Sequence, residues 1–366
     1  MAVSDRLAGF VFPGYNPIEV PNPPTLNSVP AGTTAAVTFT APTDIGGAPI
    51  SSYIVVATNT TTGAAFSASG SSSPVTISGL PEATYKVSVH AVNLYGPSGN
   101  SNTITQQMLN QGQTAYTTSG TYTWVAPAGA STVSVVCVGG GGATGNYFVL
   151  PADNFMTGGG GGALAYVNNY AVTTGNSYTV IVADGGPALG TGPSTDSSFN
   201  GTTCKAGSGG TNNSNTSGGS GGTVMNGTGG NGGQGGTAGT SNTHSGSGGG
   251  AGGYSGAGGA GVTGSTNTNG YDGSGGGGGG GGTYSSGTAG GGGGVGILGA
   301  GSSGAGGTGG YPGGGGGGGS GGNNGSNAGG IYGGGAGYWN SGAVGAVRII
   351  WPGATRQFPS TNTGDV

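Results

Sequence analysis

The chain has 366 residues, of which 99 are glycine and 4% are charged, and its formal net charge is −4 at pH 7. Five basic residues cannot form the positive stripe that releases phosphate counterions, so the composition argues against a nucleic-acid partner. The sequence has no run of eighteen apolar residues, and its first twenty residues lack the basic and apolar regions of a secretory signal.

Residues 1–20 show no clear periodicity, but they contain two prolines and three aromatic residues, Phe10, Phe12 and Tyr15. This composition fits an extended arm that lies on another surface, and it also fits a frayed terminus. Because of the aromatic residues we favour the first interpretation, an N-terminal anchoring arm.

Residues 21–107 predict an all-β domain. Four runs of alternating apolar and polar residues are separated by turn signals: AAVTFTAP (35–42), PISSYIVVAT (49–58), SPVTISGL (73–80) and YKVSVHAVN (85–93). Short strands at this spacing favour a β-sandwich.

The order PPT…VTFTAP…GGAPISSYIV…ISGL…YKVSVHAVNLYGPSGNS resembles a bacterial or phage-type fibronectin type III domain. Tyr85 stands at the position of the tyrosine corner of that family, and Asn93, Gly96 and Ser98 match its A-x-N-x-x-G-x-S segment. Phe39 stands where the family usually has tryptophan. The resemblance implies a spacer or docking module.

Residues 108–120 predict a polar connector, and residues 121–351 a glycine-rich domain. Alternating strands are expected in TYTWVAPAGASTVSVVCVGGGG (121–142), which holds two of them, in 163–172 and in 176–186. A last strand is expected at 344–351. The flanking strands, within 121–186 and at 344–351, would hold both ends of the glycine tract, and residues 352–366 would form a C-terminal tail.

The glycine tract, about residues 207–337, has runs at 273–282, 290–294, 313–319 and 333–337. Its single proline excludes collagen. A left-handed helix of the polyproline II type points its amides and carbonyls outward, so such helices can bond to one another only where nearly every residue lacks a Cβ. A disordered or silk-like tract is the alternative. The recurring blocks, the flanking strands and the apolar segment VGILGAG (295–301) favour an ordered bundle of polyglycine II helices.

The segments TYTWVAPAGASTVSVVCVGGGG, GGGGALAYVNNYAVTTGNSYTVIV and GAVGAVRIIW look like the glycine-rich domain of tailed-phage virion proteins, including those of cyanophages. The chain is similar in principle to phage tail-tip adhesins, in which a polyglycine II bundle displays loops. The resemblance implies an all-β chain: a fibronectin type III-like sandwich, then a small β-structure enclosing the glycine-rich bundle. It also implies a structural virion protein, a fibre, tip or surface appendage that presents loops to the host. Two alternatives stay open: a capsid or tail decoration protein without receptor binding, and an ice-binding protein, against which the irregular Thr and Ser spacing argues.

Reactive side chains are few. Two histidines and nine acidic residues form no catalytic motif, and C-x-x-C and H-x-x-x-H spacings are absent. Cys137 and Cys204 are either two small buried residues or a pair bridging neighbouring strands. We therefore expect no enzyme, no metal site and no cofactor.

Binding is the remaining chemistry, and the connectors between glycine runs carry the Tyr, Asn, Ser and Thr side chains typical of recognition surfaces. The candidate host-contact residues are Tyr147, Phe148, Phe155, Tyr271 and Tyr284. The expected partners are other virion proteins through the N-terminal region, and a host cell-surface polysaccharide or outer-membrane protein. A homo-oligomer is left open, and the expected location is the virion, after synthesis in the host cytoplasm.

Overall fold

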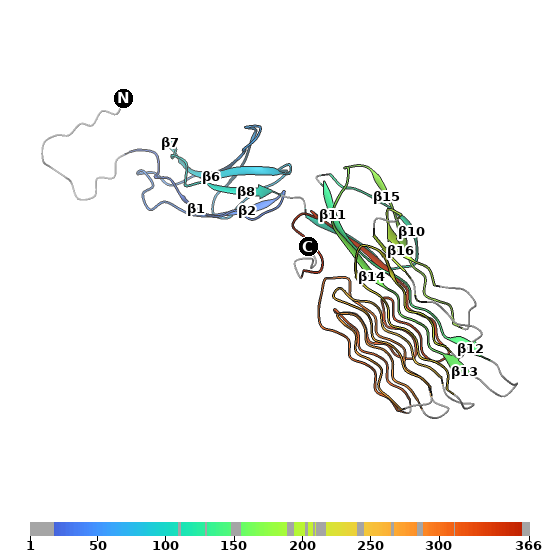
Figure 1. The fold of residues 1–366 in the computed structure, drawn as a ribbon. Helices are drawn as coiled ribbons and strands as arrows, with labels where there is room; N and C mark the ends of the chain where they lie inside the picture. The colour runs from blue at the N-terminus through green and yellow to red at the C-terminus, as the bar shows by residue number, and fades with distance from the viewer. Residues whose placement is uncertain are drawn as a thin grey trace, which may run out of the picture. The chain divides into compact units, whose positions relative to one another are not determined.

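The structure, a computed structural model, describes residues 18–108, 111–128, 130–147, 155–188, 194–201, 204–207, 209, 217–239, 245–264, 267–283, 288–310 and 312–360. The chain forms two compact units, Met1–Asn110 and Gln111–Val366 (Figure 1). The described ranges contain β-strands and no helix, which confirms the all-β prediction. These ranges contain no helix that is long and apolar enough to cross a membrane.

The first unit contains two sheets, one ordered β1-β2-β5 and one ordered β4-β3-β6-β7, with β8 also paired to β6. All of these pairs are antiparallel. The strands are β1 (Thr25–Ser28), β2 (Ala35–Thr40), β3 (Ser52–Asn59), β4 (Ala65–Gly70), β5 (Val75–Ile77), β6 (Ala83–Asn93), β7 (Gly96–Pro97) and β8 (Ile104–Met108). The four predicted strands are thus confirmed, and β1, β4, β7 and β8 are additional.

One hydrophobic cluster joins the two sheets of the first unit. Alternation places Val55 of β3 and Val87 of β6 in it, fully buried, while His90 lies on the opposite face of β6. Phe39 of β2 is 5% exposed and packs 4.7 Å from the ring of Tyr53, so it fills a core position. The apolar face predicted from the alternating pattern is therefore the packed face.

The last residues of the predicted arm are bound to the first unit. The amide of Glu19 donates to the carbonyl of Gly46 at 3.0 Å, and the Asn93 side chain donates to the carbonyl of Glu19 at 2.9 Å. Gly46 has a φ of +70°, and a Cβ there would lie 2.1 Å from the Glu19 oxygen. The close approach requires glycine at this turn. Phe10, Phe12 and Tyr15 lie outside the described residues.

The second unit contains two five-stranded sheets, ordered β10-β15-β16-β17-β18 and β19-β14-β11-β20-β9, and the hairpin β12-β13. The strands are β9 (Gly112–Tyr116), β10 (Gly120–Val125), β11 (Thr132–Val138), β12 (Gly145–Tyr147), β13 (Phe155–Thr157), β14 (Leu164–Ala171), β15 (Ser177–Val182), β16 (Ser197–Phe199), β17 (Cys204–Ala206), β18 (Val224–Asn226), β19 (Thr228–Gly230) and β20 (Ala346–Trp351).

The predicted connector at 108–120 is not a connector along its whole length. Met108 ends β8 and is fully buried in the first unit, whereas Gly112–Tyr116 forms β9, an edge strand paired with β20. Its polar side chains resemble those of a loop, and only the unpaired edge of β20 makes this segment a strand.

Strands β11 and β20 are buried on both faces, which corrects the prediction of a simple alternating strand at β11. One face packs on Trp124 and Phe199, and the other packs on Tyr254, Val295 and Ile297. A sheet covered on both sides needs near-continuous apolar runs, and VSVVCV and AVRIIW supply them. Cys137 lies fully buried within β11.

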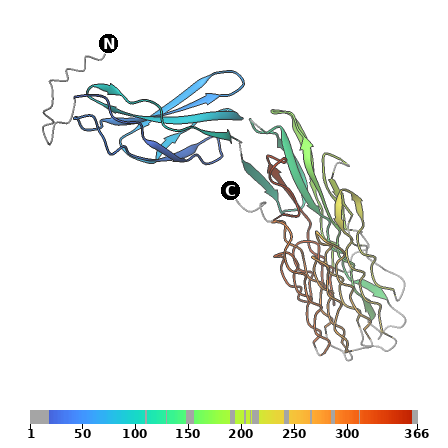
Figure 2. The same ribbon diagram turned by 60° about the vertical axis from the view of Figure 1, so that its left-hand side comes forward.

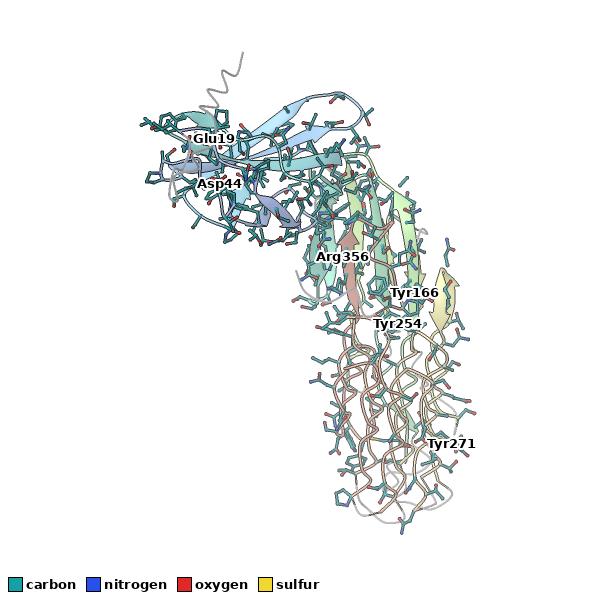
Figure 3. All side chains as sticks on the ribbon, turned by 90° about the vertical axis from the view of Figure 1, so that its left-hand side faces the viewer. Glu19, Asp44, Tyr166, Tyr254, Tyr271 and Arg356 are labelled. Carbon is teal, nitrogen blue, oxygen red and sulfur yellow. The ribbon has the colours of Figure 1, made fainter. Side chains whose placement is uncertain are left out.

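The segment predicted as a C-terminal tail packs against the fold as far as residue 360. Phe358 is 2% exposed, and its ring stacks on Tyr254 with centroids 5.8 Å apart. Its amide donates to the Asn168 side chain at 2.9 Å. Figure 3 shows Tyr254 and Tyr166 together where the sheets meet the glycine-rich region. Of the predicted packing segment 295–301, Val295 and Ile297 join this cluster, while Leu298 is 51% exposed.

Burial raises the pKa of the Tyr254 phenol well above its usual value, and its oxygen accepts a hydrogen bond from the Gly299 amide at 3.3 Å. A raised folded-state pKa stabilises the fold below the unfolded pKa of about 10, and that contribution is lost as the pH rises above it. We expect the free energy of unfolding of the second unit to fall more steeply above pH ~10 in the wild type than in Tyr254→Phe, by up to about 1.4 kcal/mol per pH unit.

Urea unfolding followed by tryptophan fluorescence measures this difference, because all three tryptophans, Trp124, Trp339 and Trp351, belong to the second unit. Parallel pH profiles for the two proteins would contradict the expected role of Tyr254.

Candidate binding face of the glycine bundle

Glycine-rich segments run back and forth side by side (Figures 1 and 2). We call the described residues of these segments, 139–144, 158–163, 217–223, 231–239, 245–264, 267–283 and 288–345, the glycine bundle. The bundle begins earlier than the predicted range of 207–337. The amide of Gly142 already donates to the carbonyl of Gly160 at 2.7 Å, so the glycines that follow β11 and β13 belong to it.

The hydrogen bonds of segment 245–253 repeat every third residue. Bonds to one neighbouring segment come from Gly246 to Met156, Gly249 to Gly159 and Gly252 to Gly162, at N···O distances of 2.8, 2.9 and 2.8 Å. Bonds to a second neighbour come from Ser247 to Val262, Gly250 to Gly259 and Gly253 to Gly256, and bonds to a third from Gly248 to Gly290 and Ala251 to Gly293. Successive residues therefore face three directions in turn.

Segment 275–283 shows the same repeat and is surrounded on all sides. Its amides donate in pairs to three neighbours: Gly277 and Gly280 to 248–251, Gly278 and Gly281 to 314–317, and Gly279 and Gly282 to 268–271. Its carbonyls accept from three others, the segments that contain Gly259, Gly293 and Gly304. The backbone groups, rather than side chains, hold these segments together.

Side chains cannot enter this lattice. A Cβ on Gly250 would lie 2.0 Å from the carbonyl oxygen of Gly277, and a Cβ on Gly277 would lie 2.0 Å from that of Gly293. Ser247 is a fully buried exception, because its hydroxyl donates to the Gly280 carbonyl at 2.6 Å and accepts from the Val262 amide at 2.8 Å. At this position the serine hydroxyl takes the place of a backbone bond.

One outer face of the bundle carries side chains at intervals of three residues. It comprises three neighbouring segments, joined by bonds from Gly232 to Gly222 at 2.9 Å and from Gly261 to Gln234 at 2.8 Å. The outward residues, all exposed or half-buried, are Ser217, Ser220 and Thr223, then Asn231, Gln234 and Thr237, then Ala257, Ala260 and Thr263. The outward positions recur regularly, but only the first segment has Ser or Thr at all three of them, so the Thr and Ser residues themselves form no regular array across the face.

A groove of about 400 Å³ runs along the third of these segments. Ala260 lies on the middle one of three bonded segments, with Gln234 and Thr237 on the segment to one side and Thr268 and Tyr271 on the segment to the other. We call Ala260 the floor of the groove and the two flanking pairs its walls. The Thr237 and Thr263 hydroxyls lie 2.7 Å apart. The Tyr271 amide donates to the Ala260 carbonyl at 3.1 Å, which fixes the second wall against the floor.

The described residues that line the groove include no Asp, Glu, Lys, Arg or His. The carboxylate next to Tyr271 belongs to Asp272, which accepts a hydrogen bond from the Gly306 amide of another segment at 2.7 Å. Amide, hydroxyl and aromatic groups therefore determine what the groove can bind.

The predicted site residues that the structure describes do not lie together in one place. Tyr271 is 64% exposed on the flank of the bundle (Figure 3), in the packed segment 267–274 rather than in a connector. Tyr147 and Phe155 are partners in the β12-β13 pairing, so the chain positions them opposite each other. Phe148 and Tyr284 lie outside the described residues.

Sequence reasoning missed Gln234, Thr237 and Ala260, although a signal for them exists. In GNGGQGGTAG (230–239) every third residue from Asn231 to Thr237 is polar, with two glycines between one and the next. In GAGGAGVTG (256–264) Ala257 and Ala260 are separated by two glycines in the same way. This spacing marks one outward side of a three-residue repeat. A count of non-glycine residues at intervals of three would have found the face.

The comparisons with known proteins agree with the composition of the second unit. A family model described as a glycine-rich domain matches residues 117–330, which is more than half of the chain. No curated protein matches the chain. The matched residues include most of the strands of the second unit and most of the glycine bundle, including the face described above. The chain therefore belongs to the family of proteins with this glycine-rich domain.

Proposed function

We propose that the chain is a structural appendage protein of a tailed-phage virion, whose glycine bundle presents a recognition surface to the host cell. The observation that carries the proposal is that backbone groups and side chains have separate roles in the bundle. Backbone bonds hold its interior, and most of its described polar side chains lie on its surface, while Tyr254, Val295 and Ile297 pack in the apolar cluster at the sheet. A scaffold of this kind tolerates exchange of surface residues, since they take little part in the packing.

The segments of the bundle are, in this proposal, polyglycine II helices. Two observations support it: the three-residue repeat of the hydrogen bonds and the six neighbours of segment 275–283. A left-handed helix of three residues per turn produces this repeat, because each residue faces one of three directions. The extended rise of such a helix makes the bundle a long, thin support.

The first unit is proposed as a fibronectin type III-like spacer. Its support is the shared core of two antiparallel sheets and the hydrogen bond from the Tyr85 hydroxyl to the Pro81 carbonyl at 3.1 Å. A tyrosine that bonds back to the chain a few residues upstream is a mark of sandwiches of this type.

An exposed apolar patch on the first unit suits attachment to another virion protein. Ile18 is 69% exposed and Leu94 83%, with Val20 and Tyr95 beside them at 41% and 43%. Gly96 lets the segment that contains Leu94 and Tyr95 approach the segment that contains Val20, since a Cβ on Gly96 would lie 3.3 Å from the Val20 side chain. Exposed apolar residues gathered in this way mark interaction sites.

Immunogold labelling of purified virions with antibody against residues 111–366 tests the proposal. We expect gold on a tail fibre or tip, and we expect the soluble full chain to bind host cells and reduce phage adsorption. Label on the capsid without host binding would favour the decoration alternative. Absence of the chain from the virion would overturn the proposal altogether.

A further inference from the structure

We infer that the groove along residues 260–263 binds an extended, neutral polysaccharide. This assignment rests on the display function proposed above and names the chemical class of its ligand. It starts from the groove itself, a hollow of about 400 Å³ on an otherwise regular face. Two elements of opposite character border the hollow: amide and hydroxyl groups on one side, and an aromatic ring on the other.

The polar side matches sugar hydroxyls. Gln234 offers both a donor and an acceptor through its amide. The Thr237 and Thr263 hydroxyls hydrogen-bond to each other at 2.7 Å, so one of them uses its donor within the pair, and the pair offers acceptor oxygens to a ligand. Sugar hydroxyls also donate and accept, so each contact can form without a buried unpaired group. Among the described lining residues the Tyr271 phenol is the one ionisable group, so they supply no countercharge to a charged ligand.

The aromatic side matches the apolar face of a pyranose ring. Tyr271 is 64% exposed, and its backbone is held to Ala260 by the bond at 3.1 Å, so the ring stands beside a floor that carries only a methyl group. Stacking on such a ring supplies apolar contact while the phenol stays in water.

The length of the ligand follows from the repeat of the bundle. The walls come from segments that run side by side, and each segment presents a side chain every three residues, on the order of 9 Å apart. An elongated chain can therefore lie along the groove and meet one set of side chains after another. A single monosaccharide would fill only part of the space.

Affinity electrophoresis of the full chain tests the assignment. The protein is run through gels that contain one polysaccharide each: amylose, dextran, mannan and galactan as neutral probes, and alginate as a charged one. We expect retardation by at least one neutral probe and none by alginate. Tyr271→Ala is expected to weaken that retardation about tenfold, and Tyr271→Phe to preserve most of it.

Ala260→Gln fills the floor of the groove and is expected to abolish retardation. Ala257→Gln is the matched control, because it places the same side chain on the same segment, one repeat away and outside the groove. Tryptophan fluorescence checks that each variant stays folded. The inference is overturned if no neutral gel retards the protein, if Ala260→Gln and Ala257→Gln behave alike, or if the chain instead shows thermal hysteresis that depends on Ala260.

The two proposals fail separately. Retardation that responds to these variants, with no chain on the virion, would leave the groove assignment standing and end the virion proposal. Tail labelling and host binding that are unchanged in Ala260→Gln would support the virion proposal and overturn the groove assignment. The host-binding residues would then lie elsewhere on the surface.

Discussion

Gly250→Ala is expected to destabilise the second unit by about 3 kcal/mol, although it adds a single methyl group. The added Cβ would lie 2.0 Å from the carbonyl oxygen of Gly277, far inside the contact distance. The neighbouring atom is backbone, so no side chain can rotate away. Segment 245–253 must then separate from segment 275–283, and the bonds repeated along both are lengthened together.

Ala257→Val is the control, because Ala257 already carries an exposed Cβ on an outer segment of the same bundle. Its expected effect is within about 0.5 kcal/mol. Urea unfolding by tryptophan fluorescence measures both variants. Equal stabilities would mean that the segments are not packed backbone to backbone.

Phe358→Ala is expected to cost about 3 kcal/mol, with the second unit losing the stack that closes its apolar cluster. Phe358 is 2% exposed and lies 5.8 Å from Tyr254 and 6.2 Å from Tyr166 between ring centroids. Removal of the ring leaves a cavity between a sheet and the bundle. Phe358→Leu should recover more than half of the loss, because it restores most of the apolar volume.

Leu298→Ala serves as the control for this cluster. Leu298 belongs to the same apolar segment as Ile297, but it is 51% exposed, so its removal creates no cavity. The expected effect is below about 1 kcal/mol. A loss for Phe358→Ala no larger than that of Leu298→Ala would show that residues beyond β20 are a tail after all.

The four strands predicted in the first unit were found because each is half-buried, and a half-buried strand alternates. Val87 faces the core and Ser88 does not, and such a period is visible without any knowledge of neighbours. By the same reasoning β9 was missed. Gln113 and Thr114 carry no apolar signal, and their strand exists because β20 offers a free edge.

The candidate site shows the same limit. The sequence identifies Tyr271 as an aromatic residue of a connector between glycine runs, and the residue is indeed exposed, although it lies in the packed segment 267–274. The groove beside it depends on distant residues, since Gln234 and Ala260 reach it from segments that are adjacent only in the packed bundle. The three-residue spacing is a local property and can be predicted from the sequence. Which segments become neighbours cannot be predicted in this way.

The amino-acid sequence by itself determined that this chain is all-β, that its strands enclose a glycine tract, and that side chains are scarce enough in that tract for backbones to touch. Alternation and the absence of Cβ atoms are local properties, so they can be read in order along the chain. Only the tertiary structure decided which segments bond to which, that Phe358 closes a core, and that Ala260 is the floor of a groove. The physical reason is that glycine segments are nearly identical to one another. The sheet and the aromatic cluster anchor one end of the bundle, and a few side chains such as Ser247 and Asp272 bond to neighbouring segments.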